Sequence, residues 1–144
     1  MRPGTDTDRL FAISLAGLWC VSLGLPAVEL GHGAVLSGWE LARSGWRAAL
    51  DGVPGWYANP LFFLSMAAAL RGRDRLAVGL AAGALGTALT SFAVGPLAAN
   101  RGYGVDSLTW RSGFFVWLTA IAALLLWAAL RKPRHAGRIP FGTP

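Results

Sequence analysis

Four apolar runs, each of about the length needed to cross a bilayer as a helix, dominate the pattern of hydrophobic and polar positions along this chain. They lie at about residues 10–28, 54–70, 76–95 and 108–130. A helix needs about 20 apolar residues to cross a hydrocarbon core of about 30 Å. Ionisable residues lie between the runs or at their ends. The pattern therefore predicts an all-α protein, an integral membrane four-helix bundle with residues 1–144 forming one transmembrane domain.

The segment between the first two runs has a periodicity of its own. Apolar side chains recur every three or four residues from Val35 to Ala49, while charged side chains fall largely on the opposite helical face. This predicts a short amphipathic helix at residues 35–51, in the first outer loop and in the plane of the membrane interface. Aromatic residues are enriched at such boundaries, and we expect four of them to form an outer interface: Trp39, Trp46, Trp56 and Tyr57.

Two features of the runs predict how the helices pack. Small residues recur every four positions in the third run, a spacing that permits close approach of backbones: Gly79, Gly83, Thr87, Ser91 and Gly95. We expect this stripe to be a packing face within the monomer, with a dimer seam as the alternative. In the second run, Asn59 and Pro60 predict a kink, because Pro60 cannot donate to the Trp56 carbonyl and Asn59 is placed to help satisfy it.

Composition and charge add a location and an orientation. Hydrophobic residues make up 54% of the chain and charged residues only 14%, against roughly 25% charged in soluble domains. Lys and Arg divide nine against four between alternate sides of the four runs, which places both termini and the short turn between the second and third runs in the cytoplasm. That turn is so short that it predicts an antiparallel helical hairpin. The cytoplasmic basic residues, including those of the tail at 131–144, are Arg71, Arg73, Arg75, Arg131, Lys132, Arg134 and Arg138.

Alternatives to this location are less consistent with the sequence. The net charge of +6 flanks the apolar runs instead of gathering on a soluble surface, so nucleic acid is not an expected partner. The first run is long for a cleaved signal peptide, and no A-x-A pattern follows it. A soluble bundle would need polar outer faces that the third and fourth runs lack.

Candidate chemistry is sparse. Cys20 is the single cysteine, which excludes an intramolecular disulfide and any multi-cysteine metal site. Glu29 and His32 have the i,i+3 spacing of di-iron bundles, but a di-iron site needs two such units and further carboxylates. With Glu40 they form a candidate polar cluster, the first ligands to test if a metal binds the outer surface. We expect no catalytic residues, cofactor or metal, because no recognised catalytic or phosphate-loop spacing occurs.

Polar residues within the runs leave one further alternative open. Asn59, Ser65, Thr87, Thr90 and Ser91 could line a narrow polar path, although such groups more often bond a neighbouring helix.

The stretch Gly55-Trp56-Tyr57-Ala58-Asn59-Pro60-Leu61 follows a loop with two tryptophans and precedes an Arg-rich hairpin. Across about residues 35–130 the chain resembles a class of small bacterial four-helix inner-membrane proteins that have no assigned activity. The resemblance implies a bacterial cytoplasmic membrane and the same four-span topology, and it implies no reaction.

These observations predict a non-catalytic, multi-pass inner-membrane protein whose partners are the lipid bilayer and a membrane protein. The expected class is an accessory or interaction subunit of a membrane complex. One alternative is a toxin-immunity or envelope-stress membrane protein. Another is a small channel or a lipid-handling protein.

Overall fold

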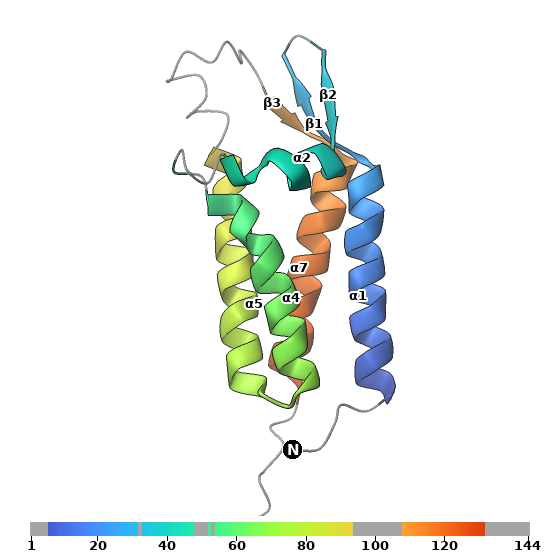
Figure 1. Ribbon diagram of the computed structural model, residues 1–144, viewed down its shortest axis with the longest axis vertical. Coiled ribbons are helices and arrows are strands. Elements are labelled where there is room, and N and C mark those ends of the chain that lie inside the picture. The colour runs from blue at the N-terminus through green and yellow to red at the C-terminus, as the bar shows by residue number, and fades with distance from the viewer. Residues whose placement is uncertain (1–5, 32, 48–51, 53, 94–107, 132–144) are drawn as a thin grey trace, which may run out of the picture.

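A computed structural model describes residues 6–31, 33–47, 52, 54–93 and 108–131. The described chain is predominantly helical, as predicted. Four α-helices lie side by side (Figure 1): α1 (Asp6–Gly24), α4 (Ala58–Leu70), α5 (Asp74–Leu89) and α7 (Ser112–Leu130). Short 3₁₀ helices extend two of them: η1 (Pro54–Tyr57) precedes α4, and η2 (Thr90–Ala93) follows α5.

The two ends of the bundle differ in structure (Figure 1). One end is covered by three strands and a short helix, β1 (Pro26–Leu30), β2 (Val35–Ser37), β3 (Leu108–Trp110) and α2 (Gly38–Ser44). We name it the cap end. The opposite end holds the start of α1, the turn between α4 and α5 and the end of α7. We name it the turn end.

The strands correct the expectation of a purely α-helical chain. They form an antiparallel sheet in the order β2-β1-β3, with Val28 paired to both Leu36 and Trp110. The β1–β2 hairpin turns through Gly33, whose φ of 84° is readily adopted by glycine alone. Each strand has only three to five residues, and β3 pairs with a strand some eighty residues earlier in the sequence. Strands this short carry too little periodicity to be recognised from the sequence.

The predicted interfacial helix at 35–51 is also corrected. Within the described residues the regular helix α2 is seven residues long, and Val35 belongs to β2 instead. Helix α2 starts at a capping box: the Glu40 backbone N–H donates to the Ser37 hydroxyl, and the Ser37 backbone N–H donates to the Glu40 carboxylate. This local signal fixes the start of the helix more strongly than the apolar periodicity that runs through residue 35. Residues 48–51 lie outside the described residues.

The hairpin between α4 and α5 is confirmed. The backbone N–H groups of Gly72 and Arg73 donate to the carbonyls of Ala69 and Ala68, at 3.0 and 2.9 Å, and close the C-terminus of α4. Gly72 has a φ of 72°, the left-handed conformation that such a helix end requires. The Ser65 hydroxyl donates across the hairpin to the Ala77 carbonyl at 2.8 Å.

The predicted stripe of small residues is only in part a packing face. Thr87 and Ser91 are half-buried and lie against Gly55 of η1, whereas Gly79 and Gly83 are exposed and Gly95 lies outside the described residues. The buried face instead consists of alanines that are fully inaccessible: Ala77, Ala81, Ala84 and Ala88. Alanine is nearly as small as glycine but buries a methyl group and favours the helix, so the core of the bundle selects the alanine face.

Two described segments are long and apolar enough to cross a membrane, judged by length and composition. They are Asp74–Ala93, with 20 residues, and Ser112–Leu130, with 19. Helix α4 has 13 residues, and α1 carries three charged residues in its first turn, Asp6, Asp8 and Arg9. The four-span membrane topology therefore stays a prediction.

Candidate functional site

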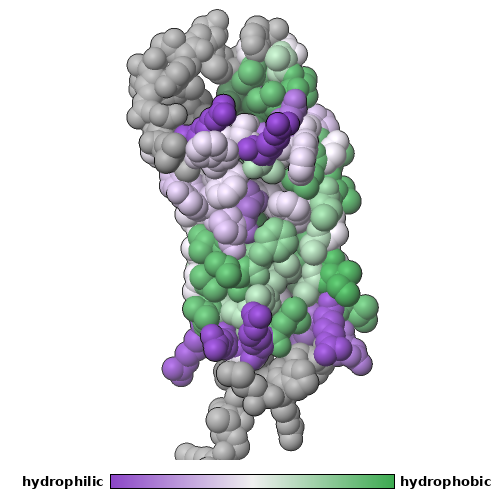
Figure 2. Space-filling model, viewed as in Figure 1, coloured by the Kyte–Doolittle hydropathy of each residue, from purple (hydrophilic) through white to green (hydrophobic). Residues whose placement is uncertain are grey.

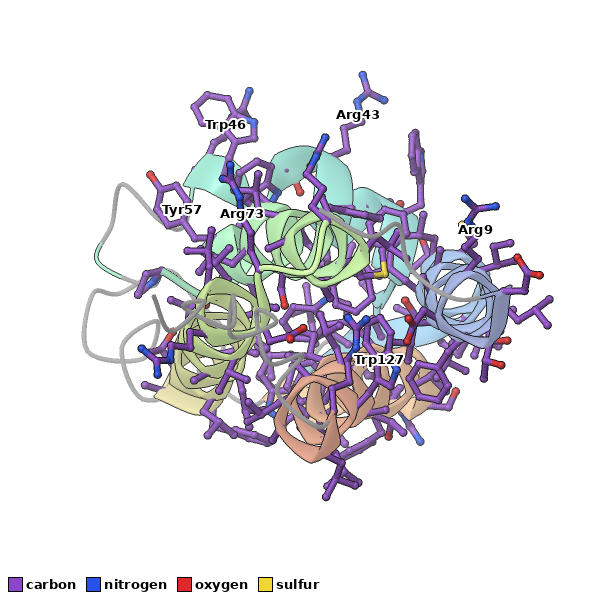
Figure 3. The ribbon with its side chains drawn as sticks, turned by 90° about the horizontal axis from the view of Figure 1, so that it is seen from below. Arg9, Arg43, Trp46, Tyr57, Arg73 and Trp127 are labelled. Atoms are coloured by element: carbon purple, nitrogen blue, oxygen red, sulfur yellow. The ribbon has the colours of Figure 1, made fainter. Side chains whose placement is uncertain are left out.

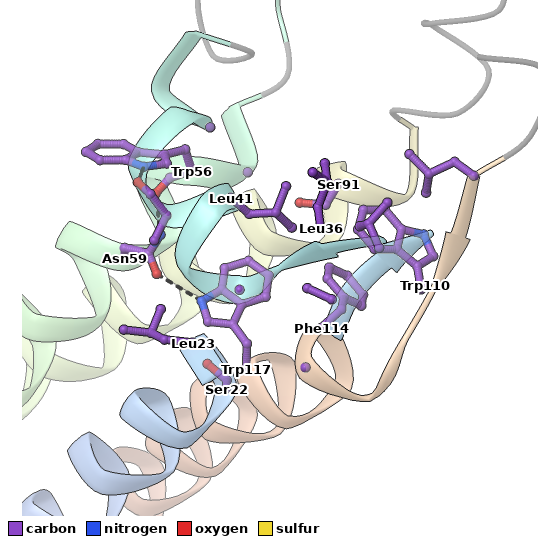
Figure 4. A pocket seen from close by; sticks show the side chains of 18 of the residues that line it. Ser22, Leu23, Leu36, Leu41, Trp56, Asn59, Ser91, Trp110, Phe114 and Trp117 are labelled. Carbon is purple, nitrogen blue, oxygen red and sulfur yellow. Dashed lines mark hydrogen bonds between the residues drawn. The ribbon is translucent and has the colours of Figure 1, made fainter. Parts of the chain in front are cut away.

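A cavity of about 310 Å³ lies at the cap end, between the helix ends and the elements that cover them (Figure 4). Every described residue that lines it is uncharged, and most are apolar. Its walls come from α1, α2, the sheet, η1, α4, η2 and α7. The lining residues are Ser22, Leu23, Ala27, Val28, Leu30, Leu36, Gly38, Leu41, Ala42, Gly45, Gly55, Trp56, Asn59, Ser91, Leu108, Trp110, Gly113, Phe114 and Trp117.

Asn59 connects three helices beside this cavity. Its amide oxygen accepts hydrogen bonds from the indole N–H groups of Trp19 on α1 and Trp117 on α7, both at 2.9 Å. Its amide nitrogen donates to the Trp56 carbonyl at 3.2 Å. Pro60 lies in the first turn of α4, directly after η1. Asn59 thus satisfies the Trp56 carbonyl, as predicted, and the change from 3₁₀ to α-helix occurs at this point.

Hydrogen bonds and close contacts hold α2 over the cavity. The Trp56 indole N–H donates to the Ala42 carbonyl of α2 at 2.7 Å. A Cβ atom at Gly38 would clash with the Ser22 carbonyl, and one at Gly55 would clash with the Ser91 hydroxyl. These two glycines therefore permit the close approach of α2 to α1 and of η1 to η2.

Aromatic rings form one wall of the cavity. Trp110 of β3 stacks on Phe114 of α7 with ring centroids 3.9 Å apart and planes inclined by 27°. Phe92 of η2 packs edge-on against both rings, at 5.9 and 5.2 Å. Trp117 continues the wall one turn further along α7, 5.6 Å from Phe114.

Hydroxyl groups predicted to line a polar path are mostly satisfied by the backbone. The Thr87 hydroxyl donates to carbonyls of its own helix at Gly83 and Ala84, both at 3.0 Å. The Thr90 hydroxyl donates to the Thr87 carbonyl at 2.6 Å. Ser91 differs, because its side chain reaches the cavity (Figure 4).

The candidate polar cluster is not assembled by the described residues. Glu29 pairs with Arg111, which joins β1 to the start of α7. Glu40 caps α2, and its pKa is lowered by the hydrogen bonds from the Ser37 backbone and hydroxyl. His32 lies outside the described residues, which hold no group of three or more His, Cys, Asp or Glu side chains that could hold a metal.

The predicted outer aromatic interface divides into two parts. Trp39 and Trp46 are 59% and 46% exposed, and Arg47 lies over the Trp46 ring with 5.5 Å between guanidinium carbon and centroid. Trp56 instead lines the cavity, while Tyr57 points outward. Figure 3 shows Arg9, Arg43 and Trp46 directed away from the bundle, in contrast to Trp127.

The predicted basic residues at the turn end also have two different environments. Arg71, Arg73 and Arg75 are exposed. Arg131 is buried, with 9% of its side chain exposed, and pairs with Asp8 at 2.9 Å and Asp74 at 3.8 Å.

The other contacts of Arg131 complete this environment. It donates to the Ala69 carbonyl at 2.7 Å, and its guanidinium lies 4.9 Å from the Trp127 ring centroid. Arg131 thus ends the fourth helix as predicted, but its guanidinium is held by these groups of the bundle and differs in this from the exposed arginines of the turn. The tail residues Lys132, Arg134 and Arg138 lie outside the described residues.

Sequence reasoning found Asn59 but not its indole partners, because Trp19 and Trp117 lie 40 and 58 residues away from it in the sequence. It also missed Asp8 and Asp74, which look like ordinary first-turn acids until Arg131 is placed beside them.

Comparison with known proteins gives no match: no family model, no curated protein and no solved structure is significantly similar to this chain.

Proposed function

We propose that the protein is a four-span integral membrane protein that acts by binding an uncharged ligand in the cap-end cavity, without catalysis. The membrane location is supported by large apolar side chains exposed on the outer faces of all four long helices. They are Leu10, Ile13, Val21, Phe63, Leu64, Leu76, Leu89, Phe115, Leu126 and Leu130. Helices on the surface of a soluble bundle carry polar residues at such positions.

The dimensions of the bundle agree with this location. Helices α1 and α7 have 19 residues each, which corresponds to about 28 Å at roughly 1.5 Å per residue, close to the hydrocarbon thickness of a bilayer. On the face shown in Figure 2, hydrophobic residues occupy the middle and hydrophilic residues lie towards both ends.

The charges at the turn end support one orientation. Three exposed arginines occupy that end, and the positive-inside rule favours its placement in the cytoplasm of a bacterial cell. The cap end and its cavity then face outward, at the boundary between lipid and water.

The cavity is the single observation that carries the binding function. Apolar pockets with a few convergent polar groups are typical of ligand sites, and this one combines an apolar lining with the amide of Asn59 and the hydroxyl of Ser91. Among the alternatives considered from the sequence, lipid handling fits this geometry best.

The experiment uses the full-length protein expressed in bacterial membranes. It should resist extraction by alkaline carbonate and dissolve in mild detergent. Organic extraction and mass spectrometry of the purified protein should then find uncharged lipids enriched over the bulk membrane. The variant Leu41→Trp, which fills the cavity, should lose this enrichment, whereas Leu64→Trp on the exposed face of α4 should retain it. Release by carbonate, or equal lipid profiles for both variants, would contradict the proposal.

An interaction subunit is the second candidate, favoured by the exposed rings of Trp39 and Trp46. Such rings are enriched at protein interfaces and in membrane belts. Photoreactive residues at Arg43 and Arg47, which flank these rings, should give a specific protein adduct if α2 meets a partner. Lipid adducts at both positions would instead assign α2 to membrane anchoring.

A further inference from the structure

We propose that the cap-end cavity binds an uncharged, planar ring that bears a carbonyl oxygen and an apolar tail, the chemistry of a membrane quinone. This inference rests on the proposed function and specifies its ligand. It is carried by three properties of the cavity: its neutrality, its aromatic wall and the direction of its polar groups.

The neutrality of the described lining disfavours charged ligands. No Asp, Glu, Lys, Arg or His is among the described residues that line the cavity. A phosphate or carboxylate bound there would lose its hydration without gaining a counter-charge, which is strongly unfavourable. The volume of about 310 Å³ lies at the lower end of the range for small-molecule pockets, roughly 300 to 1,000 Å³, and suits one ring better than a branched lipid head.

The aromatic wall favours a planar ligand. Four aromatic side chains line the cavity, namely Trp56, Trp110, Phe114 and Trp117. Aromatic rings attract one another in offset-stacked and edge-on arrangements, beyond the gain from burial alone. A saturated acyl chain would fill the same space but would gain nothing from the ring geometry.

The hydrogen bonds of Asn59 determine which polar group the ligand must carry. The amide oxygen already accepts two indole N–H groups, from Trp19 and Trp117, so its acceptor capacity is used. The amide nitrogen has two hydrogens, and the described residues supply one acceptor, the Trp56 carbonyl. What Asn59 can still offer a ligand is therefore a donor. The Ser91 hydroxyl, also on the cavity wall, can donate as well, so the site selects a carbonyl acceptor.

The experiment titrates the full-length protein in detergent micelles with decylubiquinone, by isothermal titration calorimetry. The decisive variant is Ser91→Ala. It removes a donor from the cavity wall and leaves the hydrogen bonds of Asn59 to both indoles and to the Trp56 carbonyl intact. We expect at least about tenfold weaker binding for this variant, equivalent to 1.4 kcal/mol, with a similar loss for Leu41→Trp. The control Leu64→Trp should bind as the wild type does.

Other outcomes overturn the inference. Unchanged affinity of Ser91→Ala would contradict recognition of a carbonyl, and unchanged affinity of Leu41→Trp would place the quinone elsewhere. Equal competition by dioleoylglycerol would show a site for neutral lipid chains without ring selectivity. If wild-type protein resists carbonate and retains cavity-dependent lipid but does not bind decylubiquinone, the ring inference fails while the proposed function stands.

Discussion

The four long helices are held together by different kinds of contact at the two ends of the bundle. At the turn end, Arg131 lies between Asp8 and Asp74 and also bonds the last turn of α4. At the cap end, the Glu29–Arg111 pair joins the sheet to α7, but the groups around the cavity are neutral: indole N–H groups, one asparagine and a small sheet. The turn end is closed by buried ion pairs, whereas the cap end surrounds a cavity with uncharged side chains.

This difference supports the proposed position of the ligand. A buried ion pair is costly to break, because removal of one partner leaves the other charge in a medium of low polarity. The uncharged lining of the cap-end cavity suits an uncharged molecule. In our proposal the turn end therefore fixes the arrangement of the helices, while the cap end holds the ligand.

Removal of the central charge at the turn end should have the largest effect on stability. Arg131→Met removes the guanidinium that contacts both Asp8 and Asp74, and we expect a loss of about 3 kcal/mol in the free energy of unfolding. Thermal unfolding of the detergent-solubilised protein measures it. Arg75→Met, which removes an exposed arginine at the same end, should change stability little. Equal effects of the two substitutions would show that the turn end is not clamped by charge.

Removal of the neutral connection at the cap end should cost less. Asn59→Leu leaves two indole N–H groups and the Trp56 carbonyl without partners in a partly buried site, and we expect a loss of about 2 kcal/mol. Ser91→Ala, which changes the same cavity wall but leaves these hydrogen bonds intact, should retain most of the stability. A loss for Asn59→Leu that is no larger than the loss for Ser91→Ala, by the same unfolding measurement, would mean that these hydrogen bonds do not hold the cap end together.

The packing of α5 in the bundle, between its two ends, gives a third test. Ala81→Leu adds bulk to a fully buried position, and we expect it to cost about 1 to 2 kcal/mol. Gly83→Leu should be neutral or slightly stabilising, because a Cβ there meets only Leu61 at an ordinary 3.7 Å and glycine is a poor helix former. The stripe of small residues recognised in the sequence predicts instead that Gly83→Leu costs more stability than Ala81→Leu. Thermal unfolding of the two variants therefore distinguishes the two packing faces.

Acid should loosen the start of α2, which is the smallest of the expected effects. The pKa of Glu40 is lowered by the Ser37 hydrogen bonds, so this cap contributes stability above the ordinary glutamate pKa of about 4.3 and loses it as pH falls through the lowered value. Amide exchange in α2, corrected for its intrinsic rate, should be faster at pH 3 than at pH 6. Glu40→Ala should abolish that difference. Equal protection at both pH values in the wild type would contradict the assignment.

The sequence predicted local features well and distant ones poorly. Apolar length located the four helices, and the missing N–H of Pro60 identified Asn59 as the partner of the Trp56 carbonyl, because these depend on neighbouring residues. The sheet depends on pairing of Val28 with Trp110, and the burial of Arg131 depends on Asp8, more than a hundred residues away. No periodicity carries such information. The stripe of small residues failed in part for another reason, since spacing alone does not distinguish it from the adjacent alanine face.

The most direct test of the central claim, a bilayer-embedded bundle with its cap end outside, is cysteine labelling in intact cells with a membrane-impermeant thiol reagent. Cys20 is first replaced by serine. We place the probes at the exposed positions Ser44 in α2 and Arg73 in the turn, and avoid Gly72 because of its left-handed φ of 72°. Ser44→Cys should label in intact cells, and Arg73→Cys should label only after the cells are broken. Labelling of Arg73→Cys but not of Ser44→Cys in intact cells would reverse the orientation, and labelling of both would contradict the spanning bundle itself.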